Sequence, residues 1–133
     1  MFLARLLLAL SAVTFAGFGA WFLADPEGTA RQVEIIAATP TARTDFRATY
    51  GGFNLGIGVL MAAALATRRL RDGLLLVAAA TTGYAIGRAF GIAADQAPAS
   101  LMYTLLAVEA SGCALAMFAL ARLPGDNTGE VRS

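Results

Sequence analysis

The sequence has no histidine, no lysine and a single cysteine, and these absences narrow the chemistry open to the protein. Histidine is the commonest metal ligand and the commonest general base, so Ser-His catalysis, haem ligation and most zinc sites lack their usual residues. Cys113 alone cannot form an internal disulfide or a cysteine-based metal motif, and its Ala- and Leu-rich surroundings predict a packed thiol. We therefore expect no metal and no cofactor, and a non-catalytic protein is favoured over an enzyme.

Charged residues are also scarce. They make up 14% of the 133 residues, against 58% hydrophobic residues, whereas soluble domains average about 25% and 45–50%. The net charge is +1 and no basic patch with interleaved aromatic residues is present, so nucleic acid is not an expected partner. The length suits one domain.

The hydrophobic residues gather into four runs. Each approaches the roughly 20 residues that a helix needs to cross the ~30 Å hydrocarbon layer. They cover residues 6–23, 50–67, 74–94 and 101–121. The sequence therefore predicts an all-α, four-helix transmembrane bundle over residues 1–124, followed by a polar cytoplasmic tail over residues 125–133.

A short helix is expected between the first two spans. Asp25 suits an N-cap and Pro26 the first helical position. Ala30, Val33 and Ala37 would then share one apolar face, which is typical of a helix lying at the membrane interface.

Arginine positions predict the orientation. Arg68, Arg69 and Arg71 crowd the turn between the second and third spans, and positive residues favour the cytoplasm. With this turn inside, both termini are cytoplasmic, together with Arg5, Arg122 and Arg132. The expected location is a bacterial cytoplasmic membrane, with a multi-pass topology.

The first span also has features of a signal peptide, because Arg5 precedes a leucine-rich core and small residues follow it. A cleaved signal has an apolar region of only about 7–15 residues. Here hydrophobicity continues through Trp21 to Leu23, which favours a retained helix and leaves cleavage as the alternative.

Small residues recur at steps of four in two spans. Membrane helices associate by close packing of such residues. The row in the third span is Ala79, Gly83, Gly87 and Gly91, and the pair in the second span is Gly52 and Gly56. We interpret them as packing grooves inside the bundle, with a homodimer seam as the alternative. The expected partners are membrane lipids and a second copy or a larger membrane complex.

Two charged residues lie well inside spans, where each costs about 2.5–3.5 kcal/mol on insertion scales. Arg88 lies seven residues before Asp95, and Glu109 lies nine residues after Ser100. At ~1.5 Å per residue, these antiparallel neighbours reach similar depths. The spacing predicts an ion pair between Arg88 and Glu109.

Further polar residues open the second span. Arg47, Tyr50 and Asn54 follow steps of three and four, so they share a helical face. The helix dipole disfavours a cation near the amino end, which suggests that Asp45 or Glu109 offsets Arg47. The candidate polar pocket or ion-pair cluster is Asp45, Arg47, Tyr50, Asn54, Arg88 and Glu109. It serves either as a structural staple or as an outward-opening pocket whose arginines hold an anionic or carbonyl-bearing ligand.

The segment from Asp45 to Gly52, followed by Gly56 and Gly58, resembles the second helix of the DUF4345 family of small bacterial membrane proteins. Gly87-Arg88 and Glu109 fit the same pattern. A more distant likeness to DoxX-like four-helix proteins rests on helix count and length alone. The resemblance implies a four-helix membrane domain and adds no reaction.

Three classes of function stay open. The first, and the most favoured by the sequence, is a structural or accessory membrane subunit. The second is a small-solute or proton-coupled carrier that uses Glu109 with Arg47 and Arg88. The third is a membrane enzyme or redox partner acting on a lipid or quinone headgroup.

Overall fold

The structure is a computed structural model that describes residues 1–95 and 98–124. The predicted polar tail 125–133, with Arg132, lies outside the described residues. The elements, in chain order, are α1 (Phe2–Ala24), α2 (Pro26–Gln32), α3 (Pro40–Phe46), a π-helical segment η1 (Arg47–Gly52), α4 (Phe53–Ala66), α5 (Leu70–Asp95) and α6 (Ser100–Ala121). Every regular element among the described residues is helical, which confirms the predicted all-α fold.

Four helical runs are long and apolar enough to span a membrane: Phe2–Ala24, Pro40–Ala66, Leu70–Asp95 and Ser100–Ala121. Three of them extend the predicted spans by a few residues. The second run begins at Pro40, well before the predicted residue 50, because Thr39 caps it: its hydroxyl accepts a hydrogen bond from the Ala42 N–H at 3.1 Å. Hydropathy locates the apolar part of a helix and misses its polar first turns.

The expected short helix is α2. The Asp25 carboxylate accepts the Gly28 N–H at 2.8 Å, and Pro26 is its first residue. The helix ends at Gln32, so Val33 and Ala37 do not continue the predicted face. Thr29 and Ala30 are buried, because α2 packs against the end of α1.

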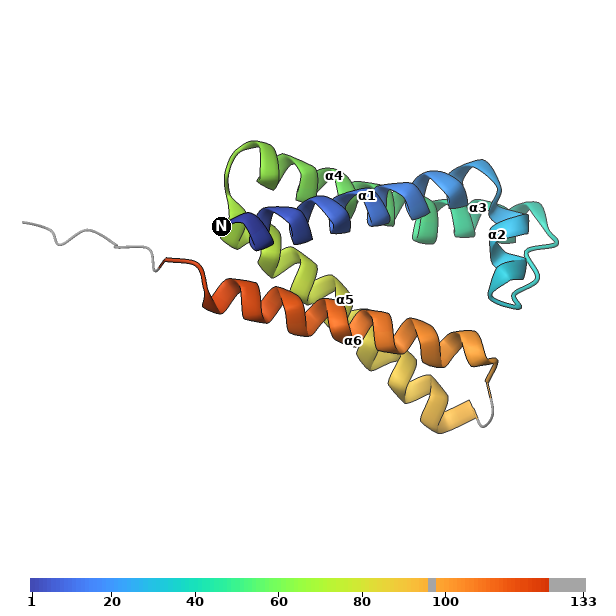
Figure 1. Cartoon of the computed structure of the whole chain (residues 1–133). Coiled ribbons are helices and arrows are strands. Elements are labelled where there is room, and N and C mark those ends of the chain that lie inside the picture. Colours follow the sequence, from blue (N-terminus) through green and yellow to red (C-terminus); the bar gives the residue numbers. More distant parts are fainter. Residues whose placement is uncertain (96–97, 125–133) are drawn as a thin grey trace, which may run out of the picture.

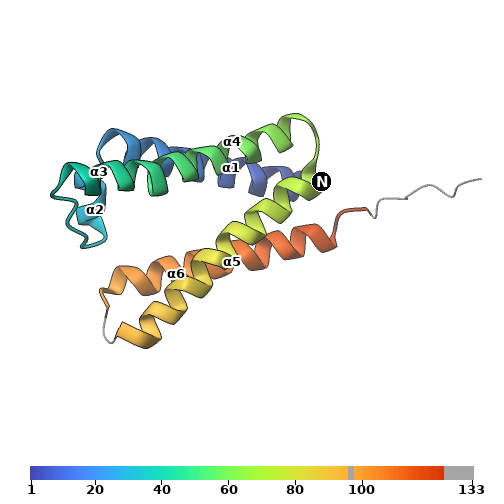
Figure 2. The same cartoon turned by 180° about the vertical axis from the view of Figure 1, so that it is seen from behind.

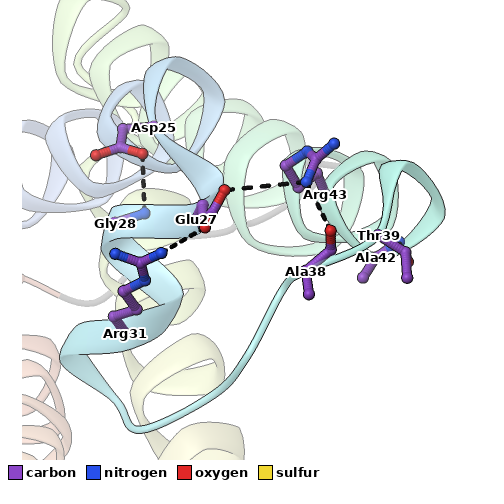
Figure 3. Close-up of polar contacts among 8 residues, drawn as sticks. All are labelled: Asp25, Glu27, Gly28, Arg31, Ala38, Thr39, Ala42 and Arg43. Atoms are coloured by element: carbon purple, nitrogen blue, oxygen red, sulfur yellow. Dashed lines mark hydrogen bonds and ion pairs between the residues drawn. The ribbon is translucent and has the colours of Figure 1, made fainter.

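Side chains on the loop tie α2 to α3 (Figure 3). The Glu27 carboxylate forms an ion pair with Arg31 and lies 3.9 Å from Nη1 of Arg43. The same Arg43 nitrogen donates to the Ala38 carbonyl at 2.9 Å. These contacts are exposed, so they position the loop more than they stabilise the fold.

The long helices form two antiparallel hairpins (Figure 1). The first hairpin pairs α1 with the continuous run of α3, η1 and α4, and the second pairs α5 with α6. The hairpins meet near residue 1 and the turn at residues 67–69, and they diverge toward α2 and α3 (Figure 2). We call the end where the hairpins meet the terminal end, and the end near α2 and α3, where they diverge, the loop end.

The apolar core lies toward the terminal end. Leu8, Met61 and Leu74 are fully buried and come from α1, α4 and α5. The two core clusters together contain Ala4, Leu8, Ala12, Met61, Leu70, Leu74, Val77, Ala78, Ala116 and Ala119. Helix α6 contributes only the small residues Ala116 and Ala119 to these two clusters. The clusters leave fewer apolar contacts between the hairpins at the loop end.

Glycines bring the backbones of α1 and α4 together. A Cβ atom on Gly58 would lie 2.5 Å from the Ala16 nitrogen and 2.9 Å from the Ala12 oxygen. Gly19 likewise faces the backbone of Leu55 and Gly51. Only glycine permits this approach, and close backbone contact is a principal source of helix association in lipid.

The glycines predicted to line packing grooves are not the ones that pack. A Cβ atom would meet nothing within 4 Å at Gly56, Gly83 or Gly87. At Gly52 and Gly91 it would meet only atoms of the same helical run, at 3.7 Å. Successive residues point in different directions around a helix, so the packed glycine of η1 is Gly51, which is buried, and its neighbour Gly52 is exposed. The grooves inside the bundle were therefore assigned to the wrong glycines, and the homodimer seam stays a prediction.

We expect Gly58→Ala to destabilise the protein by about 1–3 kcal/mol, because the added methyl group would collide with the α1 backbone. Gly56→Ala, two residues away on the same helix, is the matched control and should be neutral or slightly stabilising. Thermal unfolding of the purified variants in detergent measures both. Equal melting temperatures for the two variants would contradict the close approach of α1 and α4.

Candidate functional site

Arg88 of α5 and Glu109 of α6 form an ion pair within the second hairpin. Nε of Arg88 donates to both carboxylate oxygens, at 3.1 and 2.9 Å, and Nη2 donates to Oε1 at 2.7 Å. The two side chains are only 20% and 13% exposed. The pair expected from their depths is therefore present, with the two-pronged geometry that suits a guanidinium and a carboxylate.

The third guanidinium nitrogen has a poorer partner. Nη1 of Arg88 lies 3.1 Å from the Met102 sulfur. A thioether is a weak hydrogen-bond acceptor, so this nitrogen has capacity for a better one. Met102 also lines a partly open cavity of about 200 Å³, together with Gln32, Val33, Glu34, Pro98, Ala99 and Leu101. The cavity thus lies between the segment after α2 and the start of α6, beside the residue that Nη1 contacts.

Asn54 joins the two hairpins. Its side-chain oxygen accepts a hydrogen bond from the Tyr84 hydroxyl of α5 at 3.1 Å, and its amide donates to the Tyr50 carbonyl at 2.7 Å. Asn54 is 7% exposed. The Tyr84 ring lies 6.3 Å from that of Phe15 on α1, so three helices meet here. Sequence reasoning missed Tyr84, although it lies one turn before Arg88 on the same face of α5.

Arg47 finds a different partner from those expected. Its Nε donates to the Leu23 carbonyl at 3.1 Å, in the last turn of α1. The carboxyl end of a helix carries partial negative charge, which offsets the guanidinium. Among the described residues no hydrogen bond or ion pair joins Arg47 to Asp45 or Glu109, and Asp45 is exposed. The proposed carboxylate partners of Arg47 are replaced by a backbone oxygen.

Tyr50 packs its ring into an aromatic stack at the loop end. Its centroid lies 5.3 Å from that of Phe22 and 4.8 Å from that of Phe46. The stack belongs to the first hairpin and includes the π-helical segment η1. π-Helical segments are rare in proteins, and those that occur are often found at functional sites.

The six candidate residues therefore divide into three groups. Arg88 and Glu109 form the charged pair, and Asn54 joins the two hairpins through Tyr84. Tyr50, Asp45 and Arg47 lie on the first hairpin, and among the described residues no hydrogen bond or ion pair joins their side chains to Arg88 or Glu109. The described chain contains no group of three residues that could hold a metal ion. Arg88 and Glu109 cancel in charge, so the arrangement is suited to hydrogen bonding more than to attracting an ion.

The fold and the site define a class: the protein is a multi-pass helical membrane protein. A model described as "Domain of unknown function (DUF4345)" matches residues 3–120, and the chain belongs to this family. The family resemblance predicted from the sequence is thereby confirmed. Comparison with curated proteins and with solved structures found no match. The distant likeness to DoxX-like proteins stays a prediction.

We expect Glu109→Gln and Arg88→Gln each to lower stability by about 2–3 kcal/mol, because each leaves one charge unpaired in a largely buried position. The double variant should recover most of this loss, since both charges are then removed. Thermal unfolding in detergent provides the double-mutant cycle. Additive losses in the double variant would show that the two side chains do not stabilise each other.

Proposed function

We propose that this membrane protein binds a small, uncharged, membrane-dissolved molecule that presents a carbonyl oxygen to Arg88. The observation that carries the proposal is the contact of Nη1 with the Met102 sulfur beside a cavity. A carbonyl oxygen accepts a hydrogen bond far better than a thioether, so a ligand displacing Met102 would complete the bonding of the guanidinium.

The charge balance favours an uncharged ligand. Both oxygens of Glu109 accept hydrogen bonds from Arg88, which cancels the charge of the guanidinium. Arg47 bonds to the Leu23 carbonyl, and among the described residues it has no hydrogen bond or ion pair with Glu109, so it does not join Arg88 as a second anion-binding group at this pair. Of the two ligand classes considered from the sequence, anionic and carbonyl-bearing, the contacts support the second.

The surroundings suit a molecule with a polar head and an apolar body. The hairpins diverge toward the loop end (Figure 1), and Met102 and Val33 line the cavity there with the polar side chains of Gln32 and Glu34. The cavity of about 200 Å³ is smaller than a typical small-molecule pocket, so it has room only for the carbonyl-bearing head of such a molecule.

The test uses two carbonyl-bearing probes, monoolein and decylubiquinone, in separate titrations of the purified protein. Binding is measured as the occupied fraction in native mass spectrometry. Arg88→Lys should weaken binding of the accepted probe at least tenfold, because a single ammonium nitrogen replaces a planar fork that bonds to Glu109 through Nε and Nη2 and directs Nη1 toward the ligand. Binding of monoolein would indicate that the ligand is a glycerolipid, and binding of decylubiquinone would indicate that it is a quinone.

Arg47→Lys is the matched control, since it makes the same substitution on the other hairpin, at a guanidinium that bonds to Leu23. It should leave binding unchanged. If neither probe binds the wild-type protein, or if both lysine variants bind as the wild type does, the carbonyl-binding proposal is wrong.

An accessory structural subunit, the function favoured by the sequence, is the second candidate. Gly83 and Gly87 are exposed on α5 with open space where a Cβ would lie, and Ala79 is exposed one step before them. Another membrane helix could approach this row closely. If a partner helix binds this row, Gly87→Leu should abolish self-association or co-purification of the partner protein and leave the melting temperature unchanged. If the protein acts alone, the variant should behave as the wild type does.

A proton-coupled carrier has less support, because Glu109 is fully engaged by Arg88.

For location, we propose a bacterial cytoplasmic membrane with both termini in the cytoplasm. The proposal is supported by the arginines of the terminal end and by the mixed charges of the loop end.

A further inference from the structure

The terminal end gathers exposed arginines that no other part of the described chain engages by an ion pair. They are Arg5 on α1, Arg68, Arg69 and Arg71 around the turn from α4 to α5, and Arg122 after α6. Asp72 is the one acidic residue among them in the described chain. We propose that this end binds the phosphate groups of anionic phospholipids.

The arginines of the loop end behave differently. Arg31 and Arg43 are paired with Glu27, and Arg47 bonds to the Leu23 carbonyl. Within residues 1–95 and 98–124, none of the terminal-end arginines takes part in a salt bridge or a side-chain hydrogen bond to another residue. The contrast goes beyond the number of charges at each end, because each loop-end arginine has a hydrogen-bond or ion-pair partner within the fold, whereas the terminal-end arginines have none among the described residues.

The terminal-end arginines lie next to buried residues of the apolar core. Ala4, Leu74 and Ala119, which lie one to three residues from Arg5, Arg71 and Arg122, pack together in one buried cluster. The three chain segments that carry the charges are therefore held side by side, at the end where the hairpins meet (Figure 2).

The turn itself is also fixed. Arg68 adopts a left-handed backbone conformation, with φ of 61°, and the N–H of Arg69 donates to the Ala64 carbonyl at 2.8 Å. The Arg122 guanidinium lies 4.6 Å from the centre of the Phe118 ring, and this cation–π contact holds its side chain against α6. A preorganised set of cations loses less conformational freedom on binding than a flexible basic tail.

The chemistry matches a phosphodiester at the membrane surface. All the basic side chains of the protein are arginines, whose planar fork donates two parallel hydrogen bonds to phosphate oxygens. The ends of membrane-spanning helices lie at headgroup depth, where each basic residue strengthens attraction to anionic lipid. The ligand is therefore a lipid that is already beside the protein. The arginines bind its phosphate, and the net negative charge of its headgroup distinguishes it from a zwitterionic lipid such as phosphatidylcholine.

The experiment compares phosphatidylglycerol with phosphatidylcholine, each added to the purified full chain in detergent, with bound lipid counted by native mass spectrometry. Phosphatidylglycerol should bind more tightly. Arg68→Gln combined with Arg71→Gln should lower its affinity by roughly fivefold per arginine, about 25-fold in all. Arg31→Gln combined with Arg43→Gln is the matched control, with the same change of charge at the loop end, and should leave the affinity within about twofold.

Two further measurements test whether the effect comes from the charge of the arginines and from the lipid itself. Arg68→Lys combined with Arg71→Lys should retain part of the preference, and it replaces the glutamine variant if that variant does not fold. Inorganic phosphate at the same concentration should not displace the lipid. Equal losses in the terminal-end and loop-end variants, equal binding of the two lipids, or displacement by inorganic phosphate would each overturn the proposal.

Discussion

The close backbone contact between α1 and α4 is the constraint from which the other features follow. Within a bilayer, lipid tails compete for apolar side chains, so a helix pair is held by the closeness of its packing. Gly19, Gly51 and Gly58 provide that closeness, and together they set the rotation of α4 about its axis. This rotation turns Asn54 toward Tyr84 and leaves Gly56 facing outward.

The second hairpin is held by a different means. Its two helices share the Arg88–Glu109 pair and the contact between the Thr82 hydroxyl and the Cys113 sulfur, at 3.0 Å. Polar bonds of this kind set a register between helices, whereas close glycine packing sets a distance. The molecule therefore combines one hairpin held by backbone approach with one held by side-chain bonds, joined by an apolar core at the terminal end and by Asn54 and Tyr84 nearer the loop end.

Much of this fold could be predicted from the sequence, for identifiable reasons. Hydropathy located the four spans because their length and composition reflect the bilayer, and depth counting paired Arg88 with Glu109 because consecutive helices share a boundary. Spacing alone does not show which face of α4 meets α1, so it predicts packing at Gly52 and Gly56, whereas Gly51 and Gly58 make the contact. The partner of Arg47 is a backbone carbonyl, which every residue has and no motif marks. The contact of Nη1 with Met102 needed coordinates, since methionine is ordinarily an apolar packing residue.

The pairing of α1 with the next span, and of α5 with α6, also bears on how the protein is made. Each long helix packs most extensively against the neighbour that precedes or follows it in the chain. During synthesis, α1 therefore waits for only one further span before its main partner is present, and α5 and α6 can associate as soon as both have left the ribosome. Since domains form from the amino terminus onward during translation, such local pairing reduces the time that Arg88 spends in the membrane without Glu109.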